Sequence, residues 1–304
     1  MIDPAIFLLS FVLAFLICWL LLSPYIKKAK QVDVTGRDIH KPNSPEIAEC
    51  GGVILMLAYL IGLFFFIPFI NEALNEKIIA TAATVLLASF IGFLDDIFET
   101  RWRIKVLTPL LGGVPLVVMR LGRTTMETPI GVIDFGIFGI YYFIILPLIV
   151  TVGANAVNMF AGLNGQEAGS SIIMTLALLF LSFRFQKIEG SILLLPFLGT
   201  LIAFLYYNKY PSRVFPGDVG TFGMGTVIAC IAVLADLERG VFIMFIPHAV
   251  NALLFFIGKL RGEPPPREAL MNPDGTLPAP SLWSLRSVIL RVHPMKEKSL
   301  VYTI

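Results

Sequence analysis

Long apolar runs alternate with short polar connections along almost the whole chain. A helix needs about 20 residues to cross the roughly 30 Å of hydrocarbon in a bilayer, and nine of these runs are close to that length. Internal Gly and Pro do not argue against them, because membrane helices tolerate both. The pattern predicts spans near 4–26, 51–71, 78–94, 104–120, 139–154, 170–185, 190–207, 219–235 and 241–258.

Two further segments are ambiguous or irregular. A tenth apolar segment, 282–293, contains Arg286 and Arg291. It is either a short final span whose arginines reach the interface or a helix lying in the interface. The connection 120–138 has the Pro, Gly and β-branched residues that allow a short hairpin.

Composition supports an all-α polytopic membrane protein forming a single domain over residues 1–304. The chain is 57% hydrophobic and 14% charged, whereas a soluble domain carries about a quarter charged residues. The first run begins with Asp3 and lacks a basic segment before it, so it is read as a span and not as a cleavable signal peptide. The three cysteines form no zinc or disulfide pattern.

The distribution of Lys and Arg predicts the orientation. Connections after odd-numbered spans hold thirteen of these residues and those after even-numbered spans hold six. Because basic residues concentrate on the cytoplasmic side, the odd connections are predicted to be cytosolic and the N-terminus external. The membrane would be the plasma membrane in a prokaryote and the endoplasmic reticulum in a eukaryote.

Four polar connections contain the candidate chemistry, and all four follow odd-numbered spans. Neighbouring ones are separated by two spans, so all four should meet on one face. This layout is typical of an enzyme at a water–lipid boundary. A secondary transporter is the alternative of a different class, but transporters place ionisable residues near the middle of the membrane. The four segments are 93–107, 155–169, 210–225 and 259–278.

The first two segments combine carboxylates, amides and basic groups. Asp95 and Asp96 end one apolar run, and Lys105 follows shortly after. Adjacent carboxylates suit Mg²⁺ or proton transfer, and the basic groups suit phosphate. Asn155 and Asn158 are three residues apart and share a helix face, before the Gly-rich segment 161–165. Helix capping and a tight turn would explain only part of this set.

The last two segments each offer one main candidate. Asp218 follows Pro-Gly and precedes an apolar helix, so it is either a helix cap or a carboxylate facing the other loops. Arg267 follows a Pro run and is either a basic membrane anchor or a phosphate ligand. His248 is predicted to make a polar contact with Asn251 or with backbone, and His293 lies in the charged tail. With no P-loop and no convincing nucleophile, the set favours Mg²⁺-dependent phosphate chemistry.

Together these motifs resemble the polyprenyl-phosphate N-acetylhexosamine-1-phosphate transferase family, and most closely its eukaryotic and archaeal dolichyl-phosphate branch. The similarity runs from about residue 33 to about 290. The segments that carry it are LDDIFETRWRIK, NAVNMFAGLNGQEAG, VFPGD, IPHAVN with PPPR, and AECGGV.

The resemblance implies ten transmembrane helices. It also implies transfer of GlcNAc-1-phosphate from UDP-GlcNAc to a polyprenyl or dolichyl phosphate, with release of UMP. The reaction would depend on Mg²⁺, with Mn²⁺ as a possible substitute. No nucleic-acid partner is implied, and a homodimer is compatible with the family. The implied roles fall on these positions: Asp95 and Asp96 as the aspartate pair, Lys105 on phosphate, Asn155 beside the site, Asn158 and Asp218 on the metal, Asn164 and Phe215 on uridine, and Glu49 and Arg267 near the donor sugar and diphosphate.

One departure from the bacterial pattern is informative. Bacterial relatives that use undecaprenyl phosphate resemble DGLDG or DGLNG, whereas this chain has Ala161 at the first position and PPPR in place of a histidine-rich loop. This argues against the MurNAc-pentapeptide translocase. Another UDP-N-acetylhexosamine, or undecaprenyl phosphate as acceptor, stays open, and so does a covalent aspartyl intermediate in place of direct transfer.

Overall fold

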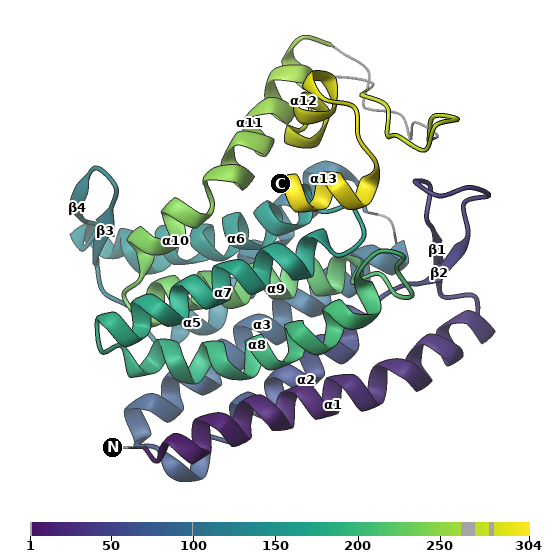
Figure 1. Cartoon of the computed structure of the whole chain (residues 1–304). Helices are drawn as coiled ribbons and strands as arrows, with labels where there is room; N and C mark the ends of the chain where they lie inside the picture. The colour runs from purple at the N-terminus through teal and green to yellow at the C-terminus, as the bar shows by residue number, and fades with distance from the viewer. Residues whose placement is uncertain (1, 99, 263–270, 280–282) are drawn as a thin grey trace.

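The computed structural model describes residues 2–98, 100–262, 271–279 and 283–304, and Figure 1 shows them as a bundle of long helices. Two short hairpins lie at opposite ends of this bundle. The helices are α1 (Pro4–Gln31), α2 (Gly52–Phe64), α3 (Glu72–Phe98), α4 (Trp102–Leu107), α5 (Val114–Val118), α6 (Leu146–Phe160), α7 (Gln166–Arg184), α8 (Ile188–Asn208), α9 (Gly217–Leu234), α10 (Glu238–Met244), α11 (Ile246–Leu260), α12 (Leu285–Val292) and α13 (Glu297–Thr303). The strands are β1 (Thr35–Arg37), β2 (Glu46–Ala48), β3 (Thr125–Thr128) and β4 (Gly131–Asp134).

The apolar helices confirm an all-α polytopic membrane protein. Within the described residues, seven helical segments are long and apolar enough to cross a bilayer. An eighth is obtained if α10 and α11, which meet at an angle of 54°, form one broken span.

The predicted span 104–120 is irregular, and the tenth segment, which the sequence left open, is too short to cross. The stretch 104–120 forms α4, a 3₁₀ segment at Thr108–Gly113 and α5, each too short to cross alone. Pro109 and Pro115 lack the amide that a continuous α-helix requires, which accounts for the change in winding. The tenth segment contains α12, whose eight residues reach only about 12 Å, well short of a bilayer. Residues 280–282 lie outside the described residues.

Helix α9 is the centre of the bundle. In its apolar window 89% of the residues are buried, against 22% for the peripheral α1. Helices α3 and α6 pack along α9, and α1 packs along α8 and α2. Two glycines of α9 let neighbouring backbones approach closely, as is common where membrane helices pack: a Cβ at Gly220 would lie 3.1 Å from Gly52 Cα, and one at Gly225 would lie 2.1 Å from Gly153 O.

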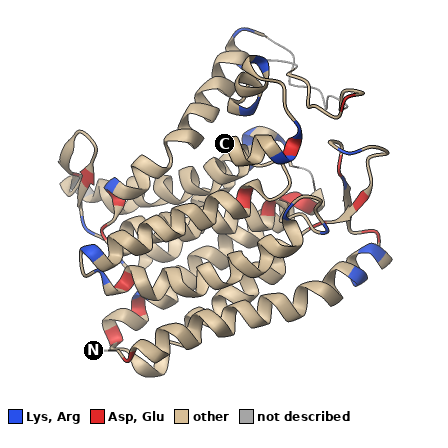
Figure 2. Ribbon diagram, viewed as in Figure 1, with Lys and Arg blue, Asp and Glu red and all other residues tan. Residues whose placement is uncertain are grey.

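Charged residues concentrate at the two ends of the bundle and leave its middle apolar (Figure 2). Hairpin β3–β4 pairs Thr125 with Asp134 at the end that also holds the N-terminus, which confirms the hairpin expected within 120–138. Hairpin β1–β2 pairs Thr35 with Ala48 at the other end. Ala48 also forms a parallel bridge with Val214, so this hairpin is fixed to the loop that precedes α9.

Candidate active site

A polar cavity of about 760 Å³ opens at the β1–β2 end of the bundle. Three of the four polar segments expected to converge contribute to its wall, together with the hairpin β1–β2. The fourth, with Arg267, lies outside the described residues. The sequence-predicted residues on the cavity wall are Glu49, Asp95, Asp96, Lys105, Asn158, Asn164, Phe215 and Asp218.

Asp96 holds the start of α9. Its Oδ1 accepts a hydrogen bond from the Asp218 amide at 2.7 Å and its Oδ2 accepts one from the Val219 amide at 3.0 Å. These amides are among those that a helix N-terminus leaves unpaired, so an aspartate there satisfies both. Gly217 makes the approach possible: its φ is +67°, and a Cβ there would lie 2.7 Å from Asp96 Oδ2.

Lys105 joins the carboxylates of two helices. Its Nζ lies 2.7 Å from Asp95 Oδ2 and also bonds Asp218 Oδ2. The other oxygen of Asp95 accepts from the amide of Thr100 at 3.1 Å and from its hydroxyl. Lys105 thus pairs with two aspartates, and Asp96 adds a third carboxylate nearby, which leaves an excess of negative charge that a bound cation would offset.

Asn158 completes this cluster from α6. Its Nδ2 donates to Asp218 Oδ1 and, at 2.9 Å, to the hydroxyl of Thr221. These contacts place the nitrogen of the Asn158 amide toward Asp218. If a cation were bound beside Asp218, the amide would turn over so that its oxygen faced the cation.

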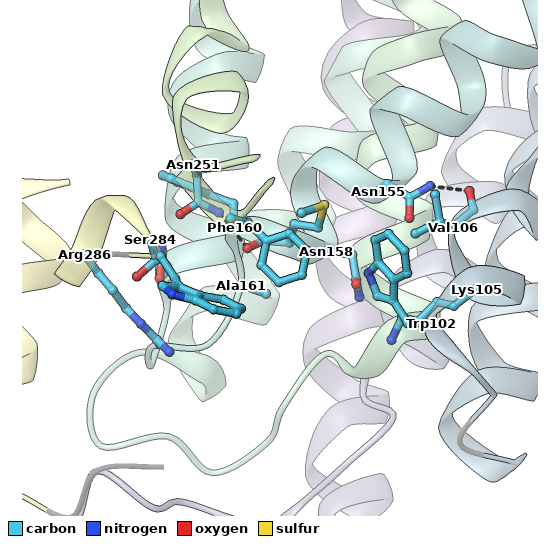
Figure 3. Close-up of a pocket in the computed structure, with 14 residues that line it drawn as sticks. Trp102, Lys105, Val106, Asn155, Asn158, Phe160, Ala161, Asn251, Ser284 and Arg286 are labelled. Atoms are coloured by element: carbon cyan, nitrogen blue, oxygen red, sulfur yellow. Dashed lines mark hydrogen bonds between the residues drawn. The ribbon is translucent and has the colours of Figure 1, made fainter. Parts of the chain in front are cut away.

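Asn155 has a different environment from Asn158, although both lie on α6. Its Nδ2 donates to Val106 O at 3.0 Å (Figure 3). It also donates to Thr151 O at 2.9 Å. The side chain thus ties α6 to α4 and fixes the helix that contains Lys105. It lines a second, smaller cavity and not the polar one.

Asn164 is held by three other segments of the chain. Its Oδ1 accepts from the Ser212 amide at 2.6 Å, its Nδ2 donates to Asp38 Oδ2 at 3.1 Å, and its backbone amide donates to Glu297 Oε1 at 2.8 Å. Lys41 bonds the other oxygen of Glu297 and lies 3.3 Å from Asp38. Sequence reasoning missed Asp38, Lys41 and Glu297, because no local pattern relates residues so far apart in the chain.

Substituting Glu297 should therefore loosen the loop that contains Asn164. We expect Glu297→Ala to weaken binding of a nucleotide ligand about 10-fold, since a charge-assisted hydrogen bond to a buried amide is lost. The matched control is Lys298→Ala, which removes an exposed side chain of the same helix. Titration of both variants with a uridine nucleotide by calorimetry measures the effect, and equal affinities would contradict this role.

Phe215 and Glu49 lie beside each other across the bridge between β2 and the α9 loop. The Phe215 amide donates to Ala48 O at 2.8 Å, and its ring lines the polar cavity. The backbone oxygen of Glu49 accepts a hydrogen bond from the Tyr25 hydroxyl at 2.6 Å. Glu49 also lines the polar cavity. Burial, and then the negative charge of Asp96, raise the pKa of Glu49.

His248 is buried without a hydrogen-bond partner among the described residues, so the polar contact predicted for it is wrong. Its ring packs instead against Phe160 and Phe245, with centroids 4.3 and 4.9 Å away. Asn251, the predicted partner, donates to Met159 O and accepts from the Leu285 amide. His293 is exposed in the tail.

The second cavity, of about 300 Å³, adjoins the polar one (Figure 3). Four of the fourteen residues that line it are aromatic, and we call it the aromatic cavity: Trp102, Phe160, Phe255 and Trp283. Lys105, Asn158, Ala161 and Arg286 line both cavities and so mark their junction.

The donor set fits Mg²⁺ better than a transition metal. Among the residues that the structure describes, no three His, Cys, Asp or Glu side chains form a closed metal cage. Mg²⁺ does not require one, because it usually binds one or two carboxylates together with waters and substrate phosphates. Asp218 presents such an oxygen ligand beside a cavity large enough for a substrate, and Asn158 would add a second one if its amide turned its oxygen toward a bound cation.

A polar cavity at one end of an apolar helical bundle, lined by carboxylates, amides and a lysine, defines an integral membrane protein with a site suited to phosphate groups. The model of the family described as glycosyl transferase family 4 matches residues 78–236, the stretch from α3 to just beyond α9. The chain belongs to glycosyl transferase family 4, which confirms the resemblance seen in its motifs.

Relatives of known name agree with this membership. The chain is 30% identical over 320 residues to the UDP-N-acetylglucosamine–dolichyl-phosphate N-acetylglucosaminephosphotransferase of Dictyostelium discoideum, covering 89% of this chain and 78% of that one. It is 26% identical over 311 residues to the Saccharomyces cerevisiae protein of the same name, covering 84% and 68%. A Saccharolobus solfataricus protein to which that name is given provisionally is 36% identical over 258 residues, covering 84% and 78%.

Proposed function

We propose that the protein transfers GlcNAc-1-phosphate from UDP-GlcNAc to a polyprenyl phosphate such as dolichyl phosphate, giving a GlcNAc-diphospho-lipid and UMP. The observation that carries the proposal is the junction of a polar and an aromatic cavity at Lys105 and Asn158, beside Asp218. A nucleotide sugar suits the first cavity and a lipid phosphate suits the second. The names of the relatives supply the particular donor and acceptor.

Mg²⁺ is the proposed cofactor, with Mn²⁺ as a substitute, and Asn158 and Asp218 would hold it. When bound, the cation neutralises charge on the diphosphate. Phe215 would stack on the uracil, Asn164 would shape the uridine loop, and Glu49 would lie near the sugar. Arg267 would add a cation near the diphosphate.

In the mechanism we propose, an oxygen of the lipid phosphate attacks the β-phosphorus of the donor. A new P–O bond forms, the bond to the bridging oxygen breaks, and that oxygen leaves with UMP. Lys105 would balance the charge that develops, and phosphoryl transfer depends mainly on such positioning and charge neutralisation.

Little base catalysis is needed, because the second pKa of a phosphate monoester is near 6 and the acceptor is mostly a dianion at neutral pH. Asp96 is already engaged by two backbone amides and Asp95 by Lys105 and Thr100, which suits both to positioning. A covalent aspartyl intermediate is the rival. Incubation with a donor labelled in its sugar phosphate, without acceptor, should leave the protein unlabelled.

We further propose that the site faces the cytosol and the N-terminus lies outside, on the basis of the Lys and Arg distribution. Accessibility labelling of cysteines introduced near Arg37 and near Val132, at opposite ends of the bundle, tests this orientation in sealed vesicles.

The reaction is tested with purified protein, Mg²⁺, labelled UDP-GlcNAc and a short polyprenyl phosphate in detergent or nanodiscs. Stoichiometric UMP and lipid-extractable label would support the proposal. UMP release with a different UDP-N-acetylhexosamine, or with undecaprenyl phosphate alone, would keep the chemistry and change the substrate. Absence of turnover with every pair would favour the transporter alternative.

Removal of divalent cations should abolish this activity. We expect at least about 100-fold loss with excess chelator, because the aspartate cluster and the diphosphate are then left without a counter-cation. Added Mg²⁺ should restore the rate, while Ca²⁺, which prefers more ligands at longer distance, should restore little. Full activity in chelator would exclude the metal role of Asn158 and Asp218.

A further inference from the structure

Arg286 lies where the polar and the aromatic cavities meet. Sequence reasoning treated it only as an arginine of the last apolar segment, yet it lines both cavities. In Figure 3, Arg286 and Lys105 stand on opposite sides of the pocket, with Asn158 and Phe160 between them. The junction therefore has a cation on each side.

The backbone of Arg286 is fixed by the start of α12. The Ser284 hydroxyl caps this helix by accepting from the Ser287 amide at 3.3 Å. The amide of Leu285, the first residue of α12, donates a hydrogen bond to Asn251 Oδ1 at 3.0 Å. This bond attaches α12 to α11. Arg286 thus extends from a helical turn that two side chains hold in place.

Gly162 leaves room for the guanidinium. This glycine has a φ of +128°, and a Cβ there would lie 3.0 Å from Arg286 Nη1. The side chain of Arg286 accordingly lies over the Gly-rich loop 161–165, next to the residues that form the polar cavity.

The nearby carboxylates are occupied by other groups. Glu167 Oε1 accepts from the Gly162 amide at 2.7 Å, and Glu297 bonds the Asn164 amide and Lys41. Within the described ranges, Arg286 has no carboxylate within ion-pair distance, whereas Lys105 has two. Burial lowers the pKa of Arg286, but a guanidinium stays protonated. The negative charges of Glu167 and Glu297 act on the guanidinium only from a distance, so an anion in the cavity can still gain a direct contact with it.

We propose that Arg286 binds the phosphate of the lipid acceptor at the junction of the two cavities, as a further substrate-binding residue of the transfer. The inference rests on the proposed function. The acceptor is favoured over the donor because Arg286 also lines the aromatic cavity, whereas Asp95, Asp96 and Asp218 line the polar cavity alone. A planar guanidinium matches two phosphate oxygens at once and leaves the third free to attack.

The test uses full-length protein in nanodiscs and three variants. Arg286→Gln removes the charge, Arg286→Lys keeps it without the planar fork, and Arg291→Gln is the control, since Arg291 is an exposed residue of the same helix. We expect Arg286→Gln to raise the KM for a short polyprenyl phosphate about 10- to 100-fold, the usual effect of losing a charge-assisted contact. The KM for UDP-GlcNAc should change less than about 2-fold, Arg286→Lys should be intermediate, and Arg291→Gln should match the parent protein.

A binding measurement separates this role from a structural one. Polyprenyl phosphate should raise the melting temperature of the parent and of Arg291→Gln but not of Arg286→Gln, while UDP should stabilise all three. Equal loss of both responses, or of both KM values, would mean that Arg286 only supports the loop and would overturn the proposal. An unchanged acceptor KM would do the same. Parent protein that is stabilised by the lipid but transfers no sugar phosphate would instead refute the proposed function.

Discussion

Replacing Asp218 by Asn is expected to reduce transfer by at least about 10³-fold, the largest effect we predict for a single side chain. Asp218 is the residue on which the cluster converges, because it bonds both Lys105 and Asn158. The substitution keeps the size of the side chain and removes its charge, so Lys105 loses a partner and the proposed metal loses a ligand.

The measurement is the rate of lipid-linked label, together with the melting temperature. Asp134→Asn is the matched control, since Asp134 lies in the hairpin at the opposite end of the bundle. We expect the control to retain full activity and the Asp218 variant to stay folded. A fully active Asp218→Asn protein would exclude this residue from the site.

Among the substitutions, replacing Gly92 by Ala should produce the second largest loss of transfer activity, because the added methyl group has no space. A Cβ at Gly92 would lie 2.4 Å from the carbonyl oxygen of Asp218, a contact that backbone atoms do not tolerate. Helix α3 must then move away from the start of α9, at a cost of about 1–3 kcal/mol for such overpacking. Because Asp96 holds that same start, the movement also displaces the aspartates around Lys105, and we expect at least about 100-fold loss of activity.

Gly169→Ala is the control for this prediction. Gly169 lies inside α7, and nothing lies within 4 Å of the position that its Cβ would take. Alanine in an open helical position should be neutral or stabilise by about 0.5–1 kcal/mol. Comparable activity and melting temperature in the two variants would show that α3 and α9 do not require this close contact.

The sequence predicts the helical architecture and most of the polar cavity because both depend on strong local patterns. Runs of apolar residues mark the helices, and the carboxylates and amides are conspicuous at their ends. The polar segments that the structure describes meet at one end because two crossings return the chain to the same face. The resemblance adds the particular chemistry, and it assigns Asn158 and Asp218 to a metal that stays a proposal.

The remainder depends on contacts between distant residues. Nothing near Asn155 indicates that its amide pairs with Val106 O, which makes it a tie between helices in this structure. The winding of 104–120 depends on how Pro109 and Pro115 are accommodated by neighbours. Glu297 and Arg286 belong to a segment that looks like a charged tail until it is seen against the loop 161–165.

The contact between Glu297 and the Asn164 amide has a consequence for biosynthesis. Chains are made from the N-terminus, and domains assemble as they emerge. Every candidate span precedes residue 297, so the spans can insert before the loop with Asn164 acquires its partner. Residue 297 must leave the ribosome before the loop with Asn164 is held in place. A nascent chain stalled upstream of α13 would therefore have its spans in the membrane while the loop with Asn164 still lacks this contact.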